Sequence, residues 1–200
     1  MPGDEPIPVI VLAAGRGRRM GGPKVLMQVL SRPWWVTQLQ RFLGARVEPV
    51  WVLAPDVAAT LRPQLEAEGG KQQFATSDPD APMFESIRAG LQQLAANPPR
   101  GVFVHPIDVP APDASVWEVL ATSGPVTVPI FQSTHGHPIF LSWAFVTQHV
   151  LGAAPGARLD HLIAGHVRYV PVQSAQVIVN LNTPAAVLAF EASHKQVGTR

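Results

Sequence analysis

Residues 7–24 read IPVIVLAAGRGRRMGGPK, an apolar run that passes directly into a glycine-rich loop. The run 7–13 is continuous and is followed by turn-forming residues, so it predicts a buried, central β-strand. Arg19 and Lys24 supply cationic donors suited to phosphate oxygens. Four glycines allow sharp turns and expose successive backbone N–H groups to an anion, namely Gly15, Gly17, Gly21 and Gly22. The stretch therefore predicts a strand that ends in a cradle for the triphosphate of a nucleotide.

The spacing of this loop excludes two common phosphate-binding patterns. The dinucleotide-binding pattern GxGxxG requires a third glycine at position 20, where the chain has Met20. The Walker A pattern requires Ser or Thr directly after its lysine, but Val25 follows Lys24 and Pro23 precedes it. The loop therefore belongs to another class of phosphate-binding turn.

Apolar runs alternate with segments of helical period along the rest of the chain, which is typical of βαβ units. No long Pro-, Gly- or Ser-rich linker interrupts this order, so residues 1–200 are predicted to form a single domain. We expect a three-layer α/β/α, Rossmann-like fold with a mostly parallel, mixed sheet. The expected strands are 7–13, 50–53, 73–75, 101–105, 126–129, 138–141, 167–172 and 177–179. The expected helices are 33–43, 57–68, 83–96, 114–121, 144–150, 158–164 and 184–193, the last with Thr183 as its N-cap.

Three candidate motifs follow predicted strands, where ligands of open α/β sheets bind. They are the glycine-rich loop, Asp108 after strand 101–105, and residues 180–182 after strand 177–179. Prolines on both sides of Asp108 stiffen its backbone, so a positioned carboxylate there is suited to Mg²⁺. An ordinary turn or helix-capping role is the alternative for this aspartate.

Composition limits the choice of partners. Lys plus Arg is 15 and Asp plus Glu is 14, and the net charge of +1 gives no reason to expect a nucleic-acid partner. No apolar stretch is long enough to span a membrane, so no membrane partner is expected. The absence of cysteine excludes disulfides and thiolate metal sites and fits a cytoplasmic protein.

The glycine-rich loop resembles the LAAGxGxRMGxPK signature of the MobA-like NTP-transferase family. It is most similar to the molybdenum-cofactor cytidylyltransferase-like branch of that family. Further similar motifs occur in the family's order and cover nearly the whole chain: MFESIRAGL at 83–91, Asp108-Val109-Pro110, Gly136-His137-Pro138, Gly156-Ala157-Arg158 and Asn182-Thr183-Pro184.

The resemblance implies a nucleotidyltransferase fold and the transfer of a nucleotidyl group, CMP from CTP, to a phosphorylated acceptor, molybdopterin, with release of pyrophosphate. It implies Mg²⁺ as cofactor and a molybdoenzyme as possible partner. The implied catalytic residues are Arg19, Lys24 and Asp108, and the metal ligands are Asp108 and Asn182. His137 and Arg158 are the implied acceptor-binding residues. The nucleotide-binding residues are Leu12, Ala13, Ala14, Gly15, Gly17, Arg19, Lys24 and Ser86.

Several alternatives stay open. The family's late motif reads D-x-[DN]-T-P-E-D, but here Asn180 replaces the acid, and alanines stand at 185 and 186. The protein is therefore either an enzyme or a degenerate relative that binds a nucleotide or pterin without turnover. The acceptor is molybdopterin, a sugar phosphate or another small metabolite. Trp34 and Trp35 either pack in the core or in an interface, which we favour, or stack on a base.

Overall fold

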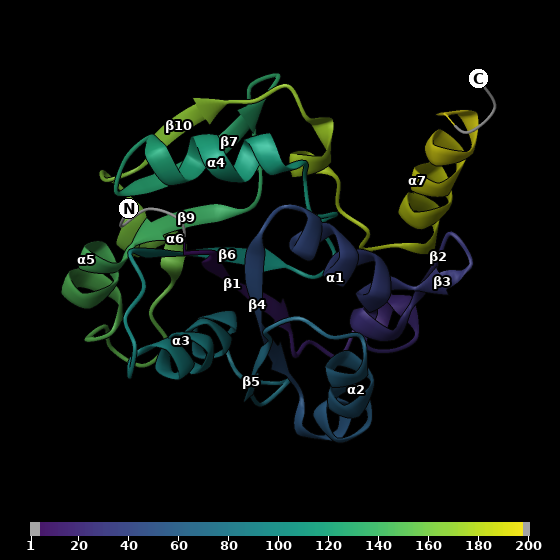
Figure 1. Ribbon diagram of the computed structural model, residues 1–200, viewed down its shortest axis with the longest axis horizontal. Coiled ribbons are helices and arrows are strands. Elements are labelled where there is room, and N and C mark those ends of the chain that lie inside the picture. Colours follow the sequence, from purple (N-terminus) through teal and green to yellow (C-terminus); the bar gives the residue numbers. More distant parts are fainter. Residues whose placement is uncertain (1–4, 198–200) are drawn as a thin grey trace.

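A computed structural model describes residues 5–197. An eight-stranded sheet forms its centre, with the strand order β10-β7-β9-β6-β1-β4-β5 and with β8 paired to β7 (Figure 1). Strand β1 (Ile7–Ala13) lies between β4 (Val47–Leu53) and β6 (Gly101–Pro106) and is parallel to both. The prediction that the first strand is central is therefore confirmed.

The sheet is mixed because two strands, β9 and the short β8, run against their neighbours. Strand β9 is antiparallel to both β6 and β7, whereas β5 is parallel to β4 and β10 is parallel to β7. This arrangement confirms the mostly parallel, mixed sheet. The bounds of these strands are Gln73–Thr76 for β5, Val126–Phe131 for β7, Thr134–His135 for β8, Ile139–Ser142 for β9 and Arg168–Pro171 for β10.

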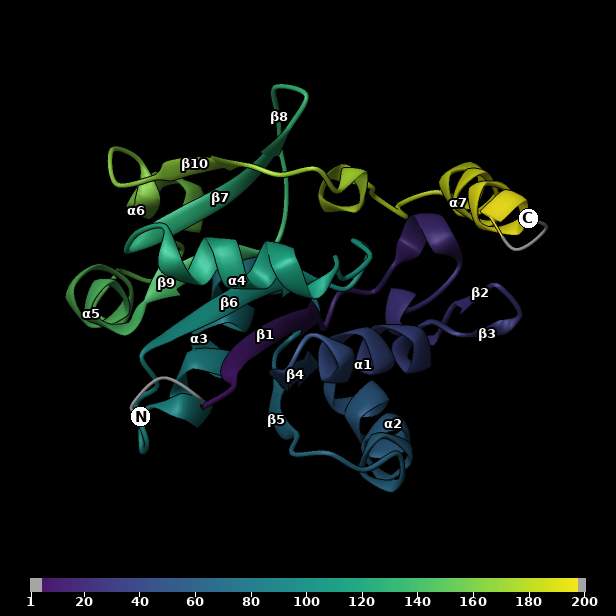
Figure 2. The same cartoon turned by 45° about the horizontal axis from the view of Figure 1, so that its top comes forward.

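Helices cover both faces of the sheet and complete the three predicted layers (Figure 2). Alternate residues of β1 face the two layers: Val9 and Val11 belong to one apolar cluster and Ile10 to the other. The Val9 side is covered by α1 (Trp34–Gly44), α2 (Pro55–Ala67) and α4 (Ala114–Thr122). The Ile10 side is covered by α3 (Met83–Leu94), α5 (Trp143–Phe145), a π-helical turn (Val146–Val150) and α6 (Leu159–Ile163).

Helix α3 approaches the central strand closely, because Gly90 faces it. A Cβ atom on Gly90 would lie 2.6 Å from Cγ2 of Ile10, too close for any side chain. The glycine therefore sets the distance between α3 and β1. This distance also places the first turn of α3 beside the loop that follows β1.

One predicted strand is wrong. Residues 177–179 do not pair with the sheet; instead Ala175–Ile178 form a 3-10 helix. Val177 is fully buried. A buried apolar side chain gives the same sequence pattern here as it would in a strand. The carbonyl of Val177 accepts a hydrogen bond from His137 N at 2.9 Å, so it is bound to a loop rather than to a strand.

The C-terminal helix α7 (Pro184–Val197) lies beside a small hairpin that the sequence did not reveal, β2 (Gln28–Val29) and β3 (Arg32–Pro33) (Figure 1). The hairpin turns through Leu30 and Ser31, both with positive φ, as a type I′ hairpin turn requires. Thr183 is confirmed as the N-cap of α7, since Ala186 N donates to its Oγ1 at 3.2 Å.

None of the helices in residues 5–197 is long and apolar enough to cross a membrane. The single domain over residues 1–200 stays a prediction, since 1–4 and 198–200 lie outside the described residues.

Candidate active site

The glycine-rich loop is folded on itself around Gly17. Its φ is 58°, and a Cβ there would lie 1.9 Å from the carbonyl oxygen of Gly22, so only glycine fits. The carbonyl oxygen of Gly17 accepts hydrogen bonds from Met20 N at 2.7 Å and Gly22 N at 3.3 Å. The N–H groups of Gly15 and Arg16 donate to no oxygen in the described part of the chain. These donors are available to an anion.

A pocket of about 390 Å³ opens between this loop and the first turn of α3. It contains all but one of the predicted nucleotide-binding residues, the exception being Ala13, which is buried at the end of β1. Arg19 lies exposed on the wall, and among residues 5–197 its guanidinium makes no hydrogen bond or ion pair. The wall includes Leu12, Ala14, Gly15, Gly17, Arg19, Lys24, Ser86 and Asp108.

Lys24 joins the three predicted motifs. Its Nζ donates to Asp108 Oδ2 at 2.8 Å and also to Asn182 Oδ1. The side chains of Lys24 and Asp108 are 20% and 13% exposed, so this ion pair is largely shielded from solvent. Leu181 N donates to the carbonyl oxygen of Asp108 at 2.8 Å, which attaches the late motif to the Asp108 segment. The three segments therefore meet as expected, although the last one follows a 3-10 helix.

Asp108 and Asn182 present one carboxylate and one amide oxygen to a common cation. These hard oxygen donors fit Mg²⁺ or Mn²⁺, which bind proteins through few carboxylates and take further ligands from water and phosphate. Within residues 5–197 no cluster of three or more His, Cys, Asp or Glu side chains is arranged for a metal. The chain can therefore supply only part of a coordination shell here.

Ser86 lies in the first turn of α3, facing the pocket, but it does not cap the helix, which begins at Met83 after Pro82. Its hydroxyl donates to Ser77 Oγ at 3.0 Å, and both serines are buried. Ser77 in turn is fixed to the end of β4, because its N–H donates to Leu53 O at 2.9 Å. The pair connects α3 to the segment that precedes it.

A second pocket, of about 610 Å³, adjoins the first and contains both predicted acceptor-binding residues, His137 and Arg158. The two pockets share Leu12, Met83 and Pro106 in their walls. Arg158 is paired with Asp160 through two hydrogen bonds, Nε to Oδ1 at 3.1 Å and Nη2 to Oδ2 at 2.8 Å. A ligand phosphate would have to share Arg158 with the Asp160 carboxylate or displace that carboxylate.

His137 is held in the loop beside the 3-10 helix, and its Nδ1 is buried without a hydrogen-bond partner. Burial lowers the pKa of His137, and the nearby charge of Asp108 opposes this shift only in part. The imidazole is therefore neutral at pH 7 and can act as a hydrogen-bonding group.

The tryptophan pair is part of the core. Trp34 is 0% and Trp35 5% exposed, so the base-stacking alternative is wrong for both. Trp34 also donates from Nε1 to Ile107 O at 2.6 Å, next to Asp108.

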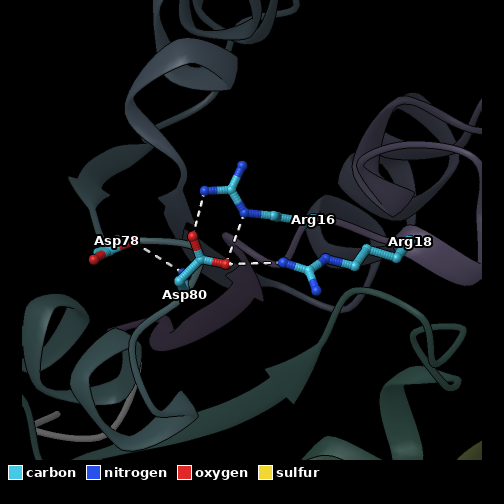
Figure 3. Close-up of polar contacts among 4 residues, drawn as sticks. All are labelled: Arg16, Arg18, Asp78 and Asp80. Carbon is cyan, nitrogen blue, oxygen red and sulfur yellow. Dashed lines mark hydrogen bonds and ion pairs between the residues drawn. The ribbon is translucent and has the colours of Figure 1, made fainter.

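Sequence reasoning missed an ionic contact beside the nucleotide pocket, whose wall includes Arg18 and, next to Asp80, the residues Asp78, Pro79 and Ala81. Figure 3 shows this contact. Arg16 donates from Nε to Asp80 Oδ1 at 2.8 Å and from Nη2 to Asp80 Oδ2, and Arg18 lies at 3.5 Å from the same carboxylate. Asp80 N donates to Asp78 Oδ1 at 2.9 Å, which shapes the turn. The Arg16 guanidinium holds the pKa of the Asp80 carboxyl below its usual range. More than 60 residues separate the partners, so no local sequence signal connects them.

The fold and the pocket define the class of protein, an α/β protein of the nucleotidyltransferase type. The model of the MobA-like NTP transferase domain matches residues 9–169, and the chain belongs to this family. No curated protein matches the sequence.

Solved structures share the fold at low sequence identity. A manganese complex of Rv0371C from Mycobacterium tuberculosis is 19% identical, with a TM-score of 0.73 over 94% of this chain and 99% of that one. The 4-diphosphocytidyl-2C-methyl-D-erythritol synthase of Anaerococcus prevotii is 15% identical, with a TM-score of 0.74 over 96% of both chains. The molybdopterin-guanine dinucleotide biosynthesis protein A of Archaeoglobus fulgidus is 18% identical, with a TM-score of 0.66 over 95% of this chain and 100% of that one.

Proposed function

We propose that this protein transfers CMP from CTP to a phosphorylated acceptor, molybdopterin, with the help of Mg²⁺. An oxygen of the acceptor's terminal phosphate attacks the α-phosphorus of CTP. The new P–O bond forms as the bond to the bridging oxygen of the β-phosphate breaks, and pyrophosphate leaves. The observation that carries this proposal is the contact of Lys24 with both Asp108 and Asn182 in the wall of a pocket lined by the glycine-rich loop.

The proposed roles follow from charge and position. The N–H groups of Gly15 and Arg16 and the cations of Arg19 and Lys24 bind the triphosphate. Asp108 and Asn182 would hold the metal, which would supply neutralisation of charge on the phosphate oxygens. Catalysis then consists largely of positioning and charge stabilisation, as in other phosphoryl-group chemistry.

The character of the second pocket supports a ring-shaped acceptor over a polyol. Apolar side chains form most of its wall, and its polar groups are confined to His137 and the Arg158–Asp160 pair. A fused heterocycle gains from such apolar burial, while its phosphate lies toward Arg158. The apolar lining includes Leu12, Phe84, Ile87, Val104, Ile139 and Leu159.

The base of the donor nucleotide is proposed from the spacing of the glycine-rich loop and from two kinds of relatives, one linked to cytidine and the other to guanine. The guanylyltransferase relatives resemble LAGG with an extra residue before the lysine, whereas this chain has LAAG and the shorter spacing, which favours CTP. The names of two structural neighbours refer to a cytidyl product and a guanine dinucleotide, so the fold accommodates either base.

A binding protein without turnover is the second candidate function. It is favoured by Asn180 and the two alanines after Pro184, which remove the acids of the family's late motif. A sugar phosphate or another small phosphorylated metabolite is the alternative acceptor for an enzyme.

Pyrophosphate release tests these functions directly. Purified protein is incubated with each of the four nucleoside triphosphates, with Mg²⁺, and with or without molybdopterin. Release that needs both CTP and molybdopterin supports the proposal, and release with another acceptor from a panel identifies a different substrate. If CTP and metal bind but no acceptor yields pyrophosphate, the protein is the non-catalytic binder.

A further inference from the structure

The segment that carries Asp108 is held by side chains. It follows Pro106, the last residue of β6, and contains Pro110 and Pro112, which have no N–H to donate to a strand ladder. Asp108 lies two residues beyond the end of β6; Ile107 N still donates to Leu12 O of β1 at 3.2 Å, but no strand pairs with Asp108 itself. The donors that replace the ladder come largely from α1.

Gln38, a buried residue of α1, contacts this segment on both sides of Asp108. Its Nε2 donates to Val109 O at 2.7 Å and to Ile107 O at 3.3 Å. Its Oε1 accepts from Ala111 N at 2.9 Å. The side chain is 0% exposed, so water does not compete for these three hydrogen bonds.

Two further side chains act on the same carbonyl groups. Trp34, one helical turn before Gln38, donates from Nε1 to Ile107 O at 2.6 Å. The Nε2 of His105 lies 2.9 Å from Val109 O, and because a carbonyl only accepts, the proton must be on Nε2. Both carbonyl groups that flank Asp108 are therefore fixed by more than one donor.

We propose that Gln38, assisted by Trp34, is a positioning residue for Asp108. The direction of a short carboxylate side chain is set by the peptide groups on either side of it. With those groups pinned, the Asp108 carboxylate points at Lys24 and Asn182 before any ligand arrives. Without Gln38, a buried N–H and a carbonyl group lose partners, and the segment shifts to regain them. The inference rests on the proposed function, since it assumes that Asp108 binds the metal of a metal–nucleotide complex.

The test compares Gln38→Leu with Gln72→Leu. Gln72 is a matched control because its amide also makes three hydrogen bonds, with Trp51 Nε1, Leu65 O and Gly69 O, far from Asp108. Calorimetry gives the CTP dissociation constant of each protein with Mn²⁺ and with EDTA, and urea unfolding gives its stability. The quantity of interest is the factor by which Mn²⁺ tightens CTP binding.

We expect the factor by which Mn²⁺ tightens CTP binding to be smaller in Gln38→Leu than in the wild type, by about tenfold or more. Removal of a group that orients a metal ligand has an effect of this size. Its CTP affinity in EDTA should stay close to that of the wild type, because the glycine-rich loop is untouched. Gln72→Leu should keep the whole factor despite a loss of stability. A Gln38→Leu protein that keeps the factor at wild-type size overturns the inference.

Trp34→Phe keeps the test decisive if Gln38→Leu does not fold. It removes one donor from Ile107 O but retains a ring against Phe190, so a smaller loss of the Mn²⁺ factor is expected. An unchanged factor in Trp34→Phe then counts against the inference. If the wild type itself shows no Mn²⁺ factor, the proposed function fails, and this outcome is distinct from a failure confined to the variants.

Discussion

The ammonium group of Lys24 occupies the position between the two proposed metal ligands: its Nζ is 2.8 Å from Asp108 Oδ2 and is also bonded to Asn182 Oδ1. Before nucleotide binds, the chain thus neutralises its own partly buried carboxylate. A divalent cation at the same oxygens would have to displace the ammonium group and would be repelled by its positive charge. A triphosphate offers Lys24 alternative acceptors and so makes room for the cation.

The first prediction is that Lys24→Met binds Mn²⁺ more tightly than the wild type when no nucleotide is present. Removal of the ammonium frees both oxygens and eliminates one like charge. We therefore expect the Mn²⁺ affinity to rise about tenfold at the effective dielectric of a protein surface. CTP affinity should fall at the same time. Titration of Mn²⁺ followed by electron paramagnetic resonance measures the change, and weaker metal binding by Lys24→Met would refute this account of the site.

The second prediction is that metal and CTP bind interdependently. Asp108 is the only carboxylate that we assign to the ion, and Mg²⁺ gives up water reluctantly, so the metal alone should hardly bind. Asp108→Asn should abolish the effect of metal on CTP affinity and any turnover. Asp113→Asn, an exposed neighbour in the sequence, is the control. Tight metal binding without CTP that survives Asp108→Asn contradicts the assignment.

Much of the fold follows from local signals, and the site follows in part. Apolar runs such as 7–13 predicted the strands because burial in a central strand leaves a continuous signal. The run at 177–179 misled the prediction because Val177 is equally buried but pairs with the His137 loop. Gln38 could not be recognised from sequence, because a glutamine on a helix carries no sign that it binds backbone about 70 residues away.

The third prediction concerns Arg19, which lines the nucleotide pocket without a bonded partner within residues 5–197. Arg19→Ala should weaken CTP binding by about tenfold or more, since a charge-assisted hydrogen bond contributes about 1.5–3 kcal/mol. The free energy of unfolding should change little, because the side chain is exposed. Arg62→Ala, an exposed arginine on α2, serves as control and should leave the calorimetric affinity unchanged.

The fourth prediction concerns Asp80, which pairs with Arg16 and with Arg18, a residue of the pocket wall (Figure 3). Asp80→Asn frees these guanidinium groups for phosphate and removes a negative charge beside the triphosphate. We expect CTP affinity to rise about two- to fivefold, the scale of an exposed ion pair. The gain should shrink as salt is added. A lower affinity would show that Asp80 itself contacts the nucleotide.

The last prediction is that stability falls with acid because of the buried His105 beneath the Asp108 segment. Burial lowers the pKa of His105 from 6.5 to about 3, with a further contribution from His137. Between these values the unfolded chain binds a proton that the folded chain does not, so stability is present above pH 6.5 and is lost as pH falls toward 3. From pH 7 to pH 5 this residue alone should remove about 2 kcal/mol from the free energy of unfolding.

His105→Gln tests this, because an amide can still donate to Val109 O but does not titrate. Urea unfolding gives the free energy of unfolding at pH 7 and pH 5. Between these two pH values it should fall less in His105→Gln than in the wild type, by about 2 kcal/mol. His135→Gln, at an exposed position on β8, is the control and should keep the wild-type drop. An identical pH dependence in the wild type and His105→Gln would show that the imidazole is protonated alike in both states, and the hydrogen bond to Val109 would then need another explanation.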